Sequence, residues 1–295
     1  MTIRAMSRTP NPIGLIGVGL LGSAIGERLL KQDFSVCCFD PNQDSVARLN
    51  AIGAESAASA TDVLRTCDVI CLSLPNSDVV RTIIADAISN VGHNHLVIDT
   101  TTGRPDDIVD IAGTLQEQGA RYLEANVAGS SEALRQGRAV LFLGGDADTV
   151  AWSRGIINAL SSSTFHIGPN GSASRLKLVH NLILGLNRAV LAEGLAFAES
   201  LGIDSATALE ILKQTPAASE VMHTKGARMV EGNYKPQARL SQHLKDVQLM
   251  LEQSPALPLT QTHEGILKQA EEFGLGDLDN SAIIEVYRTS LRKPE

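Results

Sequence analysis

Three glycines near the start of the chain limit its fold more than any other feature. Gly17, Gly19 and Gly22 have the G-x-G-x-x-G spacing, and they join an apolar run, Ile13–Val18, to a segment with helical periodicity. A glycine turn between a strand and a helix suits the pyrophosphate of a dinucleotide, because the helix N-terminus offers N–H groups and partial positive charge. The predicted cofactor turn comprises Gly17, Val18, Gly19, Leu20, Leu21 and Gly22.

A second strand-like run, FSVCCFD, ends in Asp40, about twenty residues after the glycines, as the dinucleotide fingerprint requires. An acidic side chain there accepts hydrogen bonds from the ribose hydroxyls and repels a ribose phosphate. Pro41 and Asn42 follow, and neither is an arginine that would receive such a phosphate. We therefore expect NAD to be preferred, with NADP as the alternative. The competing interpretation of Asp40 is a turn residue before Pro41.

The alternation of strands and helices continues to about residue 168. The expected strands are Val69–Leu74, His95–Thr100, Arg121–Ala125 and Ala139–Gly144, and the expected helices are around Asp44–Ala51, Val79–Ser89, Asp106–Gln118 and from Asp148. This alternation predicts an α/β Rossmann domain with a doubly wound parallel sheet, in which ligands bind at the carboxyl ends of the strands. Those ends add Leu74, Pro75, Thr101 and Thr102 to the predicted cofactor site, with Asn126–Ser131 nearby.

One long helix is expected over residues 171–201, with Gly202 as its C-cap and Asp204 placed to cap the next helix. Apolar residues lie nearly all round it, so we expect it to be buried on several sides. Lys177 and Asn181 lie four residues apart and therefore on one face. A buried lysine is unfavourable unless it is paired or used, so Lys177 is either a functional group or a snorkelling side chain near a helix start.

Beyond the long helix the sequence predicts only helices. Their expected ranges are Ala206–Gln214, a segment around Val221–Val230, Ser241–Glu252, Thr260–Phe273 and Ser281–Leu291, with Pro216, Pro236, Pro255 and Pro258 in the breaks. The predicted organisation is a loose tail over residues 1–11, a dinucleotide-binding domain over 12–168, and a helical substrate and oligomerisation domain over 169–295. A cleft between the two domains is the expected place for a small ligand.

Composition excludes several classes of partner. The net charge is −8 and aromatic residues make up 3% of the chain, which argues against a nucleic-acid partner. Cys37, Cys38, Cys67 and Cys71 lie in apolar runs without metal-ligand spacing, so we expect small core residues, no metal site and a reducing compartment. No apolar run looks long enough to span a bilayer, and the first residues lack a signal-peptide core. A cytoplasmic protein without a membrane partner is expected.

Six motifs follow one another along the chain. They are GVGLLG from Gly17, IDTTTGRP with Thr101 and Thr102, EANVAGS from Glu124 to Ser130, ASRLKLVHN with Lys177 and Asn181, the Lys245-Asp246 pair, and GLGDLDNSA from Gly274 to Ala282. In these motifs the chain resembles the β-hydroxyacid dehydrogenases, the family that includes 3-hydroxyisobutyrate dehydrogenase, tartronate semialdehyde reductase and glyoxylate/succinic semialdehyde reductase. The resemblance runs from about Ile13 to the end of the chain.

The resemblance implies hydride transfer between NAD(P) and a small anionic β-hydroxy acid or its semialdehyde. It places a general acid/base at Lys177 and a substrate-holding amide at Asn181. It also places Lys245, with one or both of Thr101 and Thr102, near the nicotinamide ribose or the substrate. The substrate loop falls on Ala128, Gly129 and Ser130, where backbone N–H groups would bind a carboxylate. A helical domain like the C-terminal domain of 6-phosphogluconate dehydrogenase and a homodimer or tetramer are also implied.

The chain departs from the family pattern in the substrate loop. Asn126 replaces a proline, Ala128 a serine and Ser130 a glycine, so these changes leave the substrate open. Two other functions remain as alternatives. One is an imine reductase of the same fold, although such enzymes usually have aspartate or tyrosine at the position of Lys177. The other is a non-catalytic NAD(P)-binding sensor or assembly module.

Overall fold

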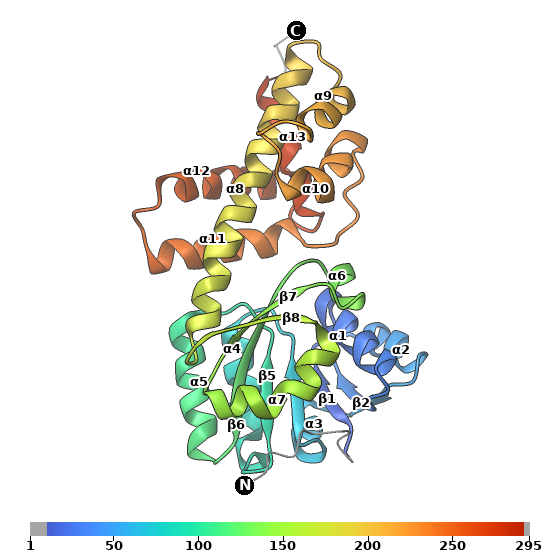
Figure 1. Cartoon of the computed structure of the whole chain (residues 1–295), viewed down its shortest axis with the longest axis vertical. Coiled ribbons are helices and arrows are strands. Elements are labelled where there is room, and N and C mark those ends of the chain that lie inside the picture. Colours follow the sequence, from blue (N-terminus) through green and yellow to red (C-terminus); the bar gives the residue numbers. More distant parts are fainter. Residues whose placement is uncertain (1–10, 292–295) are drawn as a thin grey trace. The chain divides into compact units, whose positions relative to one another are not determined.

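The computed structural model describes residues 11–291, so the predicted loose tail lies outside the described residues except for Asn11. The chain forms two compact units, Met1–Lys177 and Leu178–Glu295. The division between them falls inside the long helix, α8, which runs from Ser172 to Ser200. Figure 1 shows both units.

The first unit contains one eight-stranded sheet with the strand order β3-β2-β1-β4-β5-β6-β7-β8 (Figure 1). Its strands are β1 Ile13–Ile16, β2 Val36–Phe39, β3 Glu55–Ser56, β4 Val69–Leu72, β5 Leu96–Asp99, β6 Arg121–Ala128, β7 Val140–Gly144 and β8 Ser163–Gly168. The predicted doubly wound sheet is confirmed, with one exception: β6 and β7 are antiparallel. The segment 129–139 between them is shorter than the dozen or more residues that a parallel crossover needs.

Helices cover both faces of this sheet and give it two apolar cores. The helices are α1 Leu20–Lys31, α2 Gln43–Asn50, α3 Ala60–Thr66, α4 Ser77–Ala87, the 3-10 turn η1 Ile88–Asn90, α5 Pro105–Glu117, α6 Ser131–Arg135 and α7 Ala147–Leu160. Side chains from α1, α2 and α7 pack on one face, and those from α3, α4 and α5 pack on the other. The sequence interpretation missed β3, α3, α6 and β8, which are short or lack a clear apolar period.

All four cysteines are free and buried in these cores, as expected. Burial raises the pKa of the Cys37 and Cys38 thiols to about 11 and that of Cys71 to about 12. A thiol with a raised pKa carries little thiolate, so these residues serve as small core side chains.

Helix α8 ends as the sequence predicts. Gly202 adopts a left-handed conformation with φ of 79°, and the Asp204 carboxylate accepts a hydrogen bond from Thr207 N at the start of the next helix. The expectation that α8 is buried on several sides is wrong for one face. Val179, Ile183, Val190 and Phe197 are each more than half exposed, because no other part of the described chain covers them.

Helix α8 is also the one described helix that is long and apolar enough to cross a membrane by length and composition. Its most apolar window has a mean hydropathy of 1.2, and half of that window is buried inside the protein. The expectation that no apolar run is long enough therefore does not hold for α8 on length and hydropathy. A buried core helix has the same properties, so the finding is weak evidence for a membrane span.

The second unit is helical, as predicted. Besides α8 it contains α9 Ser205–Leu212, α10 Glu220–Glu231, α11 Leu240–Gln253, α12 Pro258–Glu272, the 3-10 turn η2 Asn280–Ile283 and α13 Ile284–Leu291. Pro258 is the first residue of α12 rather than part of the preceding break, which suits proline because that position has no helical N–H bond to lose. Apolar side chains from all these helices, most often leucine, with methionine, alanine, valine and isoleucine, form a single core.

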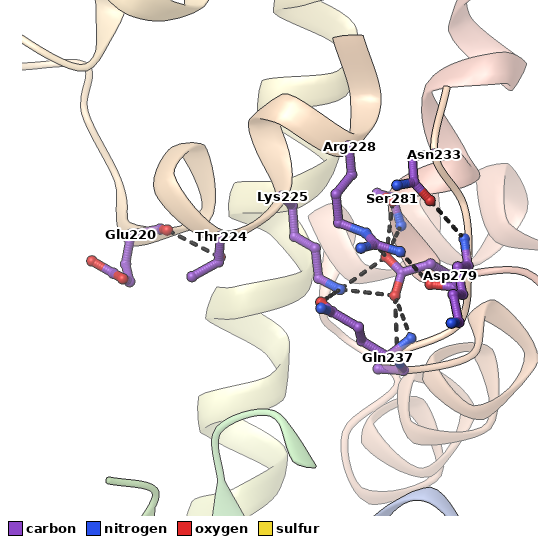
Figure 2. Close-up of polar contacts among 10 residues, drawn as sticks. Glu220, Thr224, Lys225, Arg228, Asn233, Gln237, Asp279 and Ser281 are labelled. Atoms are coloured by element: carbon purple, nitrogen blue, oxygen red, sulfur yellow. Dashed lines mark hydrogen bonds and ion pairs between the residues drawn. The ribbon is translucent and has the colours of Figure 1, made fainter. Parts of the chain in front are cut away.

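Asp279 connects α10, the start of α11 and η2 (Figure 2). Its buried carboxylate accepts hydrogen bonds from Lys225 Nζ at 2.8 and 2.9 Å, from Gln237 N, and from both Ser281 N and Oγ. Burial alone would raise the pKa of this carboxyl, but Lys225 and the other donors hold it at about 2. The GLGDLDNSA motif therefore has a structural role in the helical unit.

Candidate cofactor and catalytic site

The glycine turn between β1 and α1 has two structural glycines and one open glycine. Gly17 has φ of +93°, and a Cβ on it would lie closer than 3.0 Å to the carbonyl oxygen of Ser73. A Cβ on Gly22 would collide in the same way with the carbonyl oxygen of Gly17. A Cβ on Gly19, in contrast, would meet no atom within 4 Å. The first and third glycines are thus required by the fold, whereas the second leaves space in front of the turn.

The N-terminus of α1 is available to an anion. Gly19 is its N-cap and makes no side-chain capping hydrogen bond, and the first turn contains no acidic residue. Leu20 is largely exposed at this end, whereas Leu21 packs against the core. N–H groups without a side-chain cap, next to an open glycine, fit the pyrophosphate of a dinucleotide.

Asp40 connects the glycine turn to the end of β2. One oxygen of its carboxylate accepts a hydrogen bond from Val18 N at 2.7 Å, and the other accepts from Asn42 N at 2.7 Å. An ionised carboxylate has about four acceptor sites, so both oxygens retain capacity for ribose hydroxyls. Asp40 is therefore more than a turn residue, because it also orients the turn that it follows.

The ends of β4 and β5 are joined through Thr101. Its hydroxyl oxygen accepts a hydrogen bond from Leu74 N at 3.1 Å, and its own N–H donates to Asp99 at 2.8 Å. The structure thus brings the predicted residues Leu74 and Thr101 together, with Pro75 and Thr102 directly following them in the chain. Thr101 is buried, so its hydroxyl supports this loop pair.

Asp99 is a buried polar residue that the sequence interpretation did not single out. Its second oxygen accepts a 2.7 Å hydrogen bond from the hydroxyl of Tyr122 on β6. Burial raises the pKa of both side chains. The sequence signal was an aspartate at the end of an otherwise apolar strand, where only a specific partner makes a carboxyl tolerable.

Lys177 lies in the second turn of α8 with only 9% of its surface exposed. Its Nζ donates a 2.7 Å hydrogen bond to the carbonyl oxygen of Val127, the residue before Ala128. The snorkelling alternative is thereby excluded, because a snorkelling lysine would carry its ammonium group out to water. The structure places the amine directly beside the start of the predicted substrate loop.

Glu124 is a second buried group that the sequence interpretation quoted in a motif without giving it a role. Its carboxylate accepts hydrogen bonds from Gly171 N and from Ser174 N and Oγ, the latter two at 2.8 and 2.7 Å. Burial raises its pKa, and the hydrogen bonds from Ser174 and Gly171 oppose that shift. These bonds attach the first turn of α8 to β6.

The substrate loop leaves β6 at Ala128, which is buried, whereas Gly129 and Ser130 are exposed. Gly129 has φ of +146°, a conformation that side chains rarely adopt. The Ser130 hydroxyl oxygen accepts a hydrogen bond from Ala133 N at 3.1 Å and caps α6. Ser130 therefore has a structural use here, and its hydroxyl hydrogen remains able to donate.

In the helical unit, Asp246 brings two predicted residues together. It accepts a 2.8 Å hydrogen bond from Asn181 Nδ2 on α8, and its other oxygen lies 3.2 Å from Lys245 Nζ. Both partners were predicted from the family motifs, but Asp246 itself was quoted only as part of a pair. Its carboxylate fixes the direction in which the Asn181 amide points.

Farther along α8, a buried histidine pair lies against Gly185. His243 and His263 approach at 3.0 Å between their Nε2 atoms, and a Cβ on Gly185 would collide with the His243 ring. Arg188 is buried beyond them, and its Nε and Nη1 have no hydrogen-bond partner. Burial lowers the pKa of Arg188 to about 10, and burial with the nearby Arg188 charge lowers that of His263 to about 4. No sequence pattern identified this cluster.

Comparison with known families covers nearly the whole chain. The NAD binding domain of 6-phosphogluconate dehydrogenase matches residues 12–168, and the NAD-binding domain of NADP-dependent 3-hydroxyisobutyrate dehydrogenase matches residues 171–287. Together with the open glycine turn, these matches define an NAD(P)-dependent oxidoreductase. Within that class, the chain belongs to the β-hydroxyacid dehydrogenase family, as its motifs indicated.

Individual relatives agree with this assignment. The chain is 28% identical to 2-(hydroxymethyl)glutarate dehydrogenase of Eubacterium barkeri over 93% of its own length and 94% of that protein. It is 27% identical to glyoxylate/succinic semialdehyde reductase 1 of Arabidopsis thaliana, over 94% and 99% of the two chains. The structure of 3-hydroxyisobutyrate dehydrogenase from Salmonella typhimurium has a TM-score of 0.85 and 25% identity, covering 94% and 99%. These relatives identify an NAD(P)-dependent hydroxy-acid dehydrogenase or reductase and favour neither alternative function.

Proposed function

We propose that Lys177 is the general acid/base for hydride transfer between NAD and a small β-hydroxy acid or its semialdehyde. The observation that carries this proposal is the 2.7 Å hydrogen bond from Lys177 Nζ to Val127 O, at the start of the substrate loop. A buried amine that is fixed beside a loop of backbone donors suits proton exchange with a bound hydroxyl.

The bound nicotinamide would supply the hydride chemistry, and the protein would position the substrate and handle one proton. In the oxidation direction, the neutral Lys177 amine accepts the hydroxyl proton as the carbon loses its hydride. In the reduction direction, the protonated amine gives that proton to the oxygen of the new hydroxyl. Asn181, which follows Lys177 by one turn of α8 and is oriented by Asp246, is the proposed partner of the same substrate oxygen.

The proposed substrate carries a carboxylate. Gly129 and Ser130 offer backbone N–H groups at an exposed turn, and the Ser130 hydroxyl is a third donor. Relatives named for (hydroxymethyl)glutarate and for glyoxylate and succinic semialdehyde support a small acid of this kind. Because Ala128 has no hydroxyl, this loop offers the substrate one hydrogen-bonding group fewer than a loop with serine at that position.

The proposed cofactor is NAD rather than NADP. Both Asp40 oxygens lie at the end of β2, where backbone N–H groups of Val18 and Asn42 hold them. A carboxylate fixed in this position accepts ribose hydroxyls and repels a ribose phosphate. The nearest arginine in the following helix, Arg48, donates to Ser45.

A homo-oligomer is also proposed, with a second copy of the chain on the exposed face of α8. Val179, Ile183, Val190 and Phe197 recur at helical spacing and are uncovered in the single chain. Exposed apolar stripes of this kind mark protein contacts. A reducing, cytoplasmic location is proposed from the four free buried thiols.

An absorbance assay at the nicotinamide band tests the proposed reaction. Short β-hydroxy acids are offered with NAD or NADP, and semialdehydes and glyoxylate with NADH or NADPH. We expect turnover with one acid and a preference for NAD, and Lys177→Ala should bind NAD normally while losing at least about 100-fold in kcat. Lys268→Ala, an exposed lysine on α12, is the matched control. Near-normal turnover of Lys177→Ala would refute the role of the lysine, and turnover with NADP alone would refute the Asp40 argument.

A further inference from the structure

Strand β6 and the first two turns of α8 are joined at more than one point. Glu124 accepts hydrogen bonds from Gly171 N and from Ser174 N and Oγ. Farther along the strand, Val127 O accepts the 2.7 Å hydrogen bond from Lys177 Nζ. The same strand therefore holds both the start of the helix and the amine one turn later.

The spacing of these contacts matches the geometry of the two elements. Ser174 lies three residues after Gly171 and three before Lys177, so on the surface of α8 it is a neighbour of Lys177. A strand advances about 3.3 Å per residue, or about 10 Å from Glu124 to Val127. A helix advances about 1.5 Å per residue, or about 9 Å from Gly171 to Lys177. A shift of the first turn along β6 would therefore carry Lys177 away from its carbonyl.

Glu124 supplies hydrogen-bond acceptors and a negative charge at the start of α8. The first N–H groups of a helix have no partner within it, and α8 has no acidic residue in its first turn. The Glu124 side chain is 1% exposed, so water does not replace it as an acceptor. Its negative charge also lies at the positive end of the helix dipole.

We propose that Glu124 is a positioning residue that fixes the first turn of α8 against β6 and thereby holds Lys177 Nζ beside the substrate loop. The inference rests on the proposed acid/base role of Lys177. Asn126 strengthens the same junction, because its amide donates to Thr101 O at 3.0 Å and its oxygen lies 3.4 Å from Ser174 Oγ.

Glu124→Gln is the first test. Its amide nitrogen would face a backbone N–H, so one donor must move away from the carboxylate site. We expect kcat to fall at least about tenfold, since a misplacement of about 1 Å costs up to about 100-fold. The KM for the hydroxy acid and the Kd for NAD should stay within about twofold of wild type. Glu124→Asp keeps the charge on a shorter side chain and should restore part of kcat.

A second readout does not depend on turnover. Lys177 Nζ is buried and bonded, so an amine-reactive reagent should label it slowly in the wild-type protein, as followed by peptide mass spectrometry. Lys177 in the Glu124→Gln protein should be labelled several-fold faster than in wild type. In the activity assay, the same variant should also show a shifted pH dependence of kcat. Glu117→Gln, an exposed glutamate at the end of α5, should match wild type in both measurements.

The outcomes separate positioning from simple stability. A Glu124→Gln protein with a lower Tm but unchanged kcat, pH profile and Lys177 labelling would overturn the proposal. If that variant does not fold, Ser174→Ala removes only the hydroxyl donor; smaller changes in the same direction support the proposal, and no change overturns it. If Lys177→Ala retains turnover, the proposed function fails, but the labelling still decides whether Glu124 positions the amine.

Discussion

Gly22 packs so closely beneath Gly17 that a single added carbon on Gly22 would collide with the Gly17 carbonyl oxygen. Gly17 in turn lies against the carbonyl oxygen of Ser73. Gly19, between them in sequence, has open space where its Cβ would be. One short motif thus contains glycines that serve the fold and a glycine that is free for a ligand.

This difference predicts that one of two matched substitutions lowers stability and the other weakens cofactor binding. Gly22→Ala should destabilise the protein by about 1–3 kcal/mol, because backbone atoms must move to admit the methyl group. Gly19→Ala should leave the Tm of the cofactor-free protein within about 1 °C and weaken NAD binding at least about tenfold, because the methyl group occupies the approach of the pyrophosphate. Calorimetry of unfolding and of NAD binding measures both effects. Equal NAD affinity of Gly19→Ala and wild type would contradict the assignment of the turn.

Removing the charge of Asp279 should lower the stability of the helical unit. Asp279→Asn leaves Lys225 as a buried ammonium without its counter-ion, which costs about 3–5 kcal/mol. Asp277→Asn is the matched control, because that residue lies two positions earlier and is almost fully exposed. Urea unfolding of the two variants should give clearly different midpoints. Similar midpoints would show that the Asp279 contacts contribute little.

The low pKa of Asp279 also predicts acid sensitivity. The pKa of the Asp279 carboxyl is about 2 in the folded protein and 3.8 for the free side chain. The folded state therefore protonates this carboxyl less readily than the unfolded chain does. The resulting stability is present above about pH 4 and is lost as the pH falls from about 4 to about 2. Asp279→Asn should be less stable at neutral pH, with a flatter dependence in this acidic window. Unfolding curves recorded at several pH values for both proteins test this difference.

His263 should make the protein less stable in mild acid. Its folded pKa is lowered to about 4, so between pH 6.5 and 4 the unfolded chain takes up a proton that the folded chain does not. Stability should therefore decrease by up to about 1.4 kcal/mol per pH unit as the pH falls through this range. Burial and the positive charge of Arg188 lower this pKa, and the His243 ring lies against His263, with 3.0 Å between the two Nε2 atoms. In His263→Gln the unfolding free energy should change less with pH, and parallel curves for the two proteins would contradict this account.

The exposed face of α8 should determine the oligomeric state. Val190→Lys places a charge at its most exposed apolar residue and should shift the protein toward monomers, because burying an unpaired lysine is unfavourable. Glu193→Gln, also exposed on α8, should behave like wild type. Sedimentation velocity at several protein concentrations measures the change. A wild-type protein that is monomeric at micromolar concentration would remove the basis for a partner on this face.

The sequence predicts the elements whose patterns are local. The glycine turn, α8 with its Gly202 cap, and the five later helical segments follow from spacing, periodicity and capping residues. The short elements β3 and α6 were missed because a few residues contain too little of either period. The antiparallel β6–β7 pair depends on a connection length whose consequence appears only once the strand order is known.

The candidate site likewise contains some residues that the sequence predicts and others that only the fold brings together. Lys177, Asn181 and Asp40 stand in recognisable motifs, so their residue types could be assigned from the sequence. Glu124 lies about fifty positions from its donors, and only the fold brings them together. The histidine pair and Arg188 are separated in sequence by other helices, so their burial could not be anticipated.

The junction between β6 and α8 also constrains how the chain can change in length over evolution. The segment 129–170 contains neither Glu124 nor its donors Gly171 and Ser174, so loops within it can lengthen or shorten without moving Lys177. One residue added between Gly171 and Lys177 would instead turn the lysine about 100° around the helix axis, away from Val127. Homologues that use the same junction should therefore vary in length before the helix while keeping the three-residue steps of its first two turns.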